Sequence, residues 1–109
     1  MVRKRRRLSA TAIFATNDLM ALGVLGAARE LGVQVPDALS IVGFDDILAT
    51  AFAGPPLTTV HIDVGDIMTN ATSLLLDMIA GMEPTAPPLS EPTLVVRGST
   101  APPNAMAIK

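Results

Sequence analysis

Two pairs of polar residues, Asn17-Asp18 and Asp45-Asp46, each follow closely on an apolar run, with Thr16 between the first run and its pair. The runs, "AIFA" and "LSIVGF", are typical of short strands buried on both faces of a parallel sheet. Ligands of open parallel sheets sit beyond the carboxyl ends of the strands, so polar side chains there can meet a ligand without disturbing the core. The pattern predicts a binding site at one end of a sheet. The alternative is local: Asn17 caps a helix and Asp45 forms a turn.

Paired carboxylates could also serve glycoside hydrolysis, and the candidates are Asp45, Asp46, Asp63 and Asp66. Asp63 and Asp66 are better explained as the cap and first turn of an amphipathic helix, and Asp46 is expected to cap the turn that follows it. His61 is the single histidine, and we expect a partly exposed strand residue, because a metal site or a general base needs further positioned groups. The chain has no cysteine. We therefore expect no enzyme activity, no metal and no cofactor.

Strands and helices alternate around these residues. Asn17 or Thr16 is expected to cap a helix whose apolar positions run from Leu19 to Leu31, and Gly32 is expected to close it in the left-handed conformation. This helix carries few charges, so it needs burial by the sheet on one side and by a partner on another. The remaining expected elements are a loose segment 47–57, a strand 58–62, a helix 63–79, a proline-rich linker 83–92 and a strand 93–99.

Charge is divided unevenly along the 109 residues. Residues 1–10 hold five of the eight basic side chains, and the rest of the chain has three basic and ten acidic groups, a net charge of −7. The basic run could contact phosphates, but such runs are more often solvated tails. No apolar stretch is long enough to span a bilayer, so no membrane association is expected. We expect a basic tail over 1–10, one α/β unit over 11–103 and a tail over 104–109, in a cytoplasmic protein.

Three stretches in order resemble the effector-sensing domain of lactose-repressor/galactose-repressor (LacI/GalR) transcriptional regulators. They are "AIFATNDLMALGVLGAARELGVQVPDALSIVGFDD", "PPLTTV" at 55–60 and "LVVRGSTAPP" at 94–103. The resemblance covers about residues 11–103, and the order of several motifs makes it specific. It implies a partial periplasmic-binding-protein-like α/β fold, with a mostly parallel sheet and flanking helices, truncated to the C-terminal portion of the domain.

The resemblance also implies a function and its residues. Asn17 and Asp45 correspond to groups that contact a small effector, a sugar or a nucleoside, and a carboxylate can accept from two adjacent hydroxyls at once. Leu22 and Phe52 are the expected contacts of a homodimer. Such regulators bind operator DNA through a helix-turn-helix headpiece, which this chain is expected to lack. Ile62 stands where relatives often carry a glutamine, which leaves the effector's identity open.

Two further interpretations remain open at this point. The chain could be a stand-alone sugar-binding module that dimerises without binding DNA, or an inert remnant of a longer gene product. The basic run is not followed by a recognition helix, so sequence-specific DNA readout by this chain alone is not expected.

Overall fold

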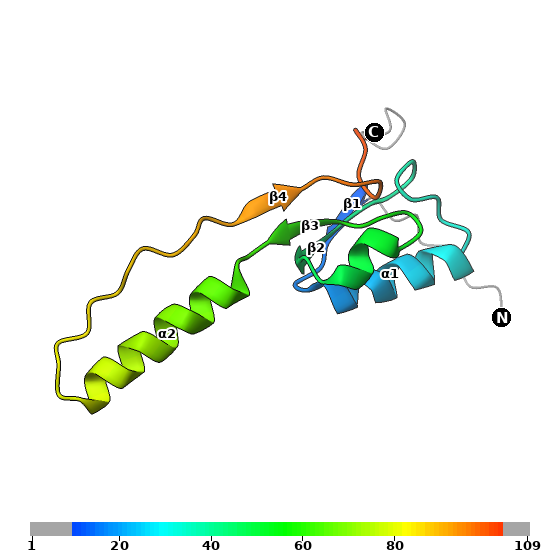
Figure 1. Ribbon diagram of the computed structural model, residues 1–109. Coiled ribbons are helices and arrows are strands. Elements are labelled where there is room, and N and C mark those ends of the chain that lie inside the picture. The colour runs from blue at the N-terminus through cyan, green and yellow to red at the C-terminus, as the bar shows by residue number, and fades with distance from the viewer. Residues whose placement is uncertain (1–9, 104–109) are drawn as a thin grey trace.

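The computed structural model describes residues 10–103, which form one mixed α/β unit with a long projecting helix (Figure 1). The elements, in chain order, are β1 (Ala12–Phe14), α1 (Asp18–Glu30), β2 (Ser40–Asp45), the 3₁₀ helix η1 (Leu48–Phe52), β3 (Thr58–His61), α2 (Val64–Ile79) and β4 (Thr93–Val95). The predicted basic tail 1–10, apart from Ala10, and the predicted tail 104–109 lie outside the described residues. Within residues 10–103, neither α-helix combines the length and apolar character that a bilayer-spanning helix needs.

The four strands form one sheet in the order β1-β2-β3-β4. β1, β2 and β3 are parallel, and β4 runs antiparallel to β3. The β1–β2 connection passes through α1, as predicted, and the β2–β3 connection passes through η1, which lies in the segment 47–57 that was expected to be loose. The expected mostly parallel α/β sheet with flanking helices is confirmed.

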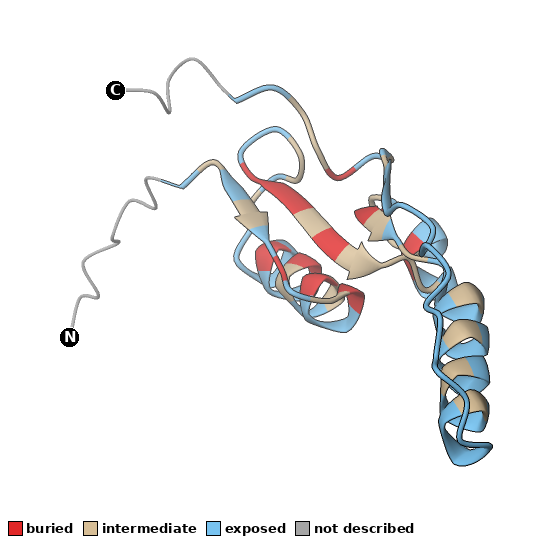
Figure 2. Cartoon of the chain, turned by 90° about the vertical axis from the view of Figure 1, so that its left-hand side faces the viewer, coloured by how far each residue is buried: buried red, intermediate tan, exposed pale blue. Residues whose placement is uncertain are grey.

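The core lies between α1 and the middle of the sheet, where the buried residues gather (Figure 2). Its apolar members are Ala15, Ala21, Leu25, Leu39, Ile41 and Leu57. β2 supplies the centre of this core because it has a strand on both sides. The small residues Ala21 and Ala28 let α1 approach the sheet closely, and both are buried.

β1 differs from the prediction of a strand buried on both faces. Ala12 and Phe14 are exposed, and Phe14 keeps 62% of its surface accessible. The physical reason is position: among the described residues β1 pairs only with β2, so it forms an edge of the sheet. The last strand is also shorter than predicted, since β4 ends at Val95 and residues 97–101 bind β2 and β3 through side-chain hydrogen bonds instead.

α2 projects from this core as an arm, with residues 83–92 returning beside it in extended form (Figure 1). The described chain therefore measures 66 × 31 × 28 Å. Asp63 caps α2, because its Oδ1 accepts from the Asp66 amide at 2.9 Å. Gly81 ends the last turn in the left-handed region, as Gly32 does for α1. None of the residues of α2 is buried.

Candidate functional site

Asn17 and Asp45 leave neighbouring parallel strands at the same edge of the sheet. Phe14 of β1 is in register with Val42 of β2, and each candidate residue comes three positions after its member of that pair. The register therefore places Asn17, which follows β1, and Asp45, the last residue of β2, at the carboxyl ends of neighbouring strands. Both side chains are partly exposed, as a ligand contact requires.

Asn17 is the N-cap of α1. Its backbone is extended, and its Oδ1 accepts a hydrogen bond from the Met20 amide at 2.9 Å. This satisfies one of the amides that the first turn of a helix leaves without a partner. The cap occupies the side-chain oxygen of Asn17, so its amide NH₂ is the group available as a donor to another molecule.

The two aspartates after β2 have different surroundings. Both have left-handed backbone conformations, with φ of 113° at Asp45 and 57° at Asp46, which is uncommon for residues other than glycine. The Asp46 carboxylate receives a bond of 2.7 Å from Arg97 Nη2 and lies 3.0 Å from Nδ1 of His61. Among residues 10–103, the side chain of Asp45 makes no comparable bond. The structure thus engages one carboxylate and leaves its neighbour available.

Arg97 ties Asp46 to the inner part of the fold. Its Nη1 donates to the carbonyl of Leu57 at 2.9 Å and to Thr50 Oγ1 at 3.0 Å, while Nη2 binds Asp46. The hydrogen bond from Arg97 lowers the pKa of Asp46 below its ordinary value of 3.8; burial opposes this, and the charge of Arg97 and the hydrogen bond with His61 lower the pKa further. Asp46 is therefore held ionised. It does not cap η1 as predicted, since Ile47 is the N-cap residue and has no side-chain cap bond.

Asp18, the second residue of the polar pair expected at the ligand end of the sheet, is instead the most deeply buried charged residue of the described chain. Its side chain is fully buried, with Oδ1 accepting from Thr59 Oγ1 at 2.6 Å and Oδ2 accepting from the Ile47 amide at 2.8 Å. These bonds join the start of α1 to β3 and to the segment before η1. Gly43 of β2 leaves the space for this carboxylate, because a Cβ there would overlap Oδ1. Asp18 is a structural residue, and its neighbour Asn17 is the one left near the surface.

His61 is placed as expected, partly exposed at the end of β3, with half of its side-chain surface accessible. No group of three or more potential metal ligands occurs in the described part of the chain. Two of the carboxylates considered for glycoside chemistry have structural roles instead. Asp63 caps α2, and Asp66 accepts a hydrogen bond of 2.7 Å from Ser90.

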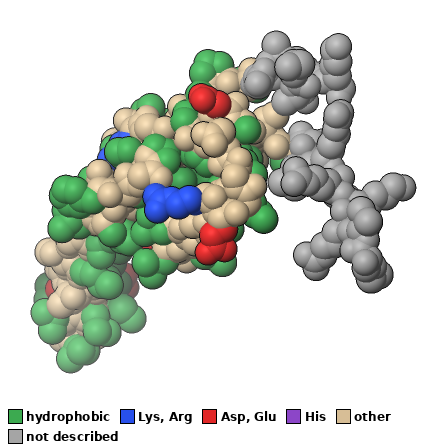
Figure 3. Space-filling model, turned by 90° about the vertical axis from the view of Figure 1, so that its right-hand side faces the viewer, with side chains coloured by type: hydrophobic (Ala, Val, Ile, Leu, Met, Phe, Trp, Pro, Cys, Tyr) green, Lys and Arg blue, Asp and Glu red, His purple; other side chains and the backbone are tan. Residues whose placement is uncertain are grey.

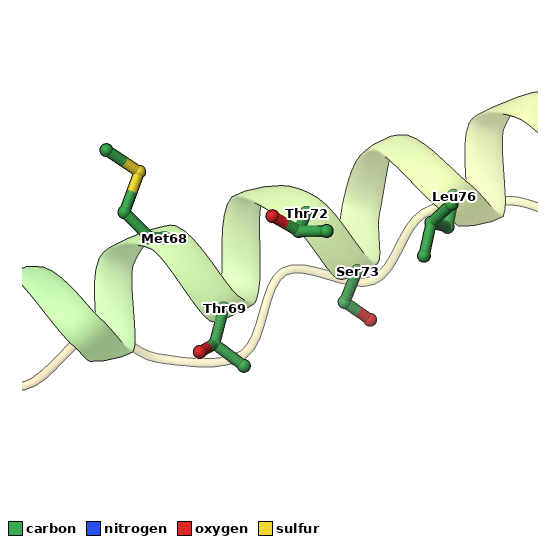
Figure 4. Close-up of a pocket in the computed structure, with 5 residues that line it drawn as sticks. All are labelled: Met68, Thr69, Thr72, Ser73 and Leu76. Carbon is green, nitrogen blue, oxygen red and sulfur yellow. The ribbon is translucent and has the colours of Figure 1, made fainter.

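Two hollows lie along α2, away from the strand ends. The larger, of about 470 Å³, is lined by Met68, Thr69, Thr72, Ser73 and Leu76. All five belong to one helix, so this hollow is an open groove along its surface (Figure 4). The other, of about 200 Å³, lies between α2 and residues 86–89. Neither contains Asn17 or Asp45.

The two expected interface residues differ in exposure. Phe52 of η1 keeps 81% of its surface accessible, whereas Leu22 of α1 is half-buried against the core. The segment of η1 runs beside α1, because Asp18 binds Ile47 at one end and Arg29 approaches Gly54 at the other. The exposed apolar side chains of these two elements are Leu19, Met20, Leu48 and Phe52. Figure 3 shows hydrophobic surface over both the core and the arm, with few charged side chains between.

Comparison with known proteins gives matches over most of the chain. Residues 1–100 match the family described as periplasmic binding protein-like domain. The transcriptional regulator MalR of Streptomyces coelicolor is 50% identical over 95 residues, which cover 84% of this chain and 27% of MalR.

Solved structures agree with this match. A sugar-binding transcriptional regulator of the LacI family from Escherichia coli superposes with a TM-score of 0.72 at 35% identity, covering 84% of this chain and 34% of that chain. The dimeric Lac repressor superposes with a TM-score of 0.76 at 35% identity, covering 86% and 35%. The chain thus spans about a quarter of its curated relative and about a third of these structures.

Proposed function

Because the chain belongs to the periplasmic binding protein-like family, as part of the sensor domain of a LacI/GalR-type regulator, we propose that it contributes to transcription control by binding a small effector. Its relatives are transcriptional regulators and not enzymes. The proposed effector is a sugar or a nucleoside, bound at the ends of β1 and β2. In this function the chain acts in the cytoplasm, and operator DNA is contacted by a separate headpiece and not by residues 10–103.

The observation that carries this proposal is the unequal use of Asp45 and Asp46. Arg97 and His61 engage Asp46, while within residues 10–103 the Asp45 carboxylate has no hydrogen-bond partner and the Asn17 side chain uses only its oxygen, for the helix cap. An acceptor pair next to a donor suits adjacent hydroxyl groups, which both donate and accept. The left-handed backbone at Asp45 supports the same role, because such conformations cost about 1–3 kcal/mol and gather at binding sites.

Calorimetry on the full chain with a panel of pentoses, hexoses and nucleosides tests this proposal. We expect heat of binding with at least one member, and its loss in Asp45→Asn, which keeps the shape but removes the charge. Asp37→Asn is the matched control, because Asp37 is an exposed aspartate in a turn of the same domain. Absence of heat with every ligand, or equal binding by Asp45→Asn, would contradict the proposal.

We also propose a homodimer formed by α1 and η1, centred on Phe52 with Leu22 beside it. The support is the exposed aromatic side chain of Phe52 in the same short helix as the exposed Leu48, since large exposed apolar patches mark interaction sites. The similarity to a dimeric Lac repressor also supports the proposed homodimer. Sedimentation of Phe52→Glu should show a smaller fraction of dimer than the parent chain. An unchanged fraction would remove Phe52 from the interface.

A further inference from the structure

Asp45 and Asp46 are consecutive residues in a backbone conformation that side chains other than glycine rarely adopt. Their φ angles are 113° and 57°. Such a conformation persists only where the surrounding structure fixes it, because an unrestrained chain relaxes to negative φ. The contacts of the two residues and of their neighbours therefore determine whether the conformation is kept.

The backbone on each side of the pair is attached to the fold. Asp45 is the last residue of β2 and is in register with His61 of β3. The Ile47 amide donates to Oδ2 of the buried Asp18 at 2.8 Å. Asp46 lies between these two attachments, and its side chain holds the turn that the chain makes there.

Arg97 is the stronger of the two partners of that side chain. Its Nη2 donates to Asp46 Oδ1 at 2.7 Å, while Oδ2 of the same carboxylate lies 3.0 Å from Nδ1 of His61. The side chain of His61 is 50% accessible, whereas that of Arg97 is 21% accessible. A bond between two charged groups is stronger when both are shielded from solvent, so Arg97 contributes most to holding Asp46.

Arg97 is itself fixed at both ends. Its backbone amide donates to Thr58 Oγ1 at 3.0 Å. At the tip of the side chain, Nη1 donates to the Leu57 carbonyl and to Thr50 Oγ1, and both of these residues are fully buried. The guanidinium therefore belongs to the rigid part of the fold, with one nitrogen bound to the interior and the other to Asp46.

We propose that Arg97 is a positioning residue of the effector site, which fixes Asp46 and thereby keeps Asp45 in the left-handed conformation that binds the effector. This inference rests on the proposed role of Asp45. Arg97 acts through Asp46 and does not contact the effector. When the pair relaxes, only a fraction of the molecules has the binding conformation, and the apparent affinity falls by that fraction.

Nuclear magnetic resonance of the full chain measures the conformation without a ligand. A positive φ brings the amide proton of a residue close to its own α proton, so Asp45 and Asp46 should each show a strong nuclear Overhauser effect between these protons. In Arg97→Met, which keeps an unbranched side chain but removes its donors, we expect both effects to weaken while the amide shifts of the core stay unchanged. Arg29→Met is the matched control, because it removes one positive charge from the exposed last turn of α1.

Calorimetry of the same variants, with the sugars or nucleosides that bind the parent chain, measures the consequence for binding. We expect Arg97→Met to weaken binding at least about tenfold, and Arg29→Met to leave it unchanged. Arg97→Lys keeps the charge but offers one nitrogen in place of two. It should therefore weaken binding less than Arg97→Met does, and in the same direction.

Retention of both Overhauser effects in Arg97→Met, or their loss without a loss of affinity, would overturn the role of Arg97. Shift changes spread over the whole domain would assign Arg97 a general structural role and would also contradict positioning. Should Arg97→Met not fold, Arg97→Lys decides, because a local weakening of the two effects is still required of it. A parent chain that binds no ligand would contradict the proposed function, and the Overhauser effects would still decide whether Arg97 sets the conformation of Asp45.

Discussion

The two α-helices contrast in how sequence relates to burial. α1 has 13 residues, two interior glycines and a less regular apolar stripe, yet Asp18, Ala21, Leu25 and Ala28 are buried. α2 has 16 residues, and its apolar stripe is more regular, yet none of its residues is buried. α1 has a sheet to lie on and α2 does not. An amphipathic pattern therefore specifies a face, while burial depends on a surface that faces it.

The largest expected loss of stability follows from removing Asp18, the buried carboxylate of α1. Asp18→Ala should lower the free energy of unfolding by about 3 kcal/mol, because the buried Thr59 hydroxyl and the part-buried Ile47 amide would both lose their acceptor. Urea denaturation followed by circular dichroism measures this loss. Gly43→Ala should also be destabilising, since its Cβ overlaps the same carboxylate. A loss below about 1 kcal/mol for Asp18→Ala would mean that water replaces the carboxylate, which the part-buried Ile47 amide allows more readily than the buried Thr59 hydroxyl.

Matched leucines test the contrast between the helices directly. Leu25 of α1 is 8% exposed and Leu75 of α2 is 56% exposed. Leu25→Ala should cost about 2–3 kcal/mol of stability, because it leaves a cavity in the core. Leu75→Ala should change the stability by less than about 0.5 kcal/mol at concentrations where the chain is monomeric. Similar losses in the two variants would show that the arm is packed in solution.

Arg97 should contribute a pH-dependent stability. The pKa of Asp46 is lowered in the folded chain. The ion pair of Asp46 with Arg97 therefore contributes its full stability above the ordinary pKa, and this stability is lost as the pH falls through the lowered pKa. Arg97→Met should therefore cost about 1–2 kcal/mol at neutral pH. The difference from the parent chain should shrink below pH of about 4. Urea denaturation at both pH values measures it, and a difference that persists in acid would assign the loss to the bonds of Arg97 with Leu57 and Thr50, which do not need an ionised Asp46.

Removing the helix caps should give the smallest losses of stability, and the result should again differ between α1 and α2. Asn17→Ala and Asp63→Ala each delete one capping bond, worth about 1 kcal/mol. The first should lower global stability, because α1 unfolds with the core. The second should increase hydrogen exchange in α2 only, since that helix can open alone. A fall in core stability for Asp63→Ala would show that the arm and the core unfold together.

Local features were predictable from sequence and distant pairings were not. Asn17, Asp63 and Gly32 act where the sequence placed them, because caps depend on a few neighbouring residues. The bonds of Asp18 to Thr59 and of Asp46 to Arg97 join residues 41 and 51 positions apart. Their partners follow from strand order and register, which a single sequence does not reveal. The ligand role of Asn17 and Asp45 and the interface role of Leu22 and Phe52 stay predictions.

The methionines of the described chain all lie at its surface. Met20, Met68, Met78 and Met82 are each between 58% and 62% exposed, and there is no cysteine to react first. Peroxide would convert these thioethers to polar sulfoxides without entering the core. Three of the four belong to the arm, so mild oxidation would turn an apolar stripe into a hydrophilic one while the sheet stays folded.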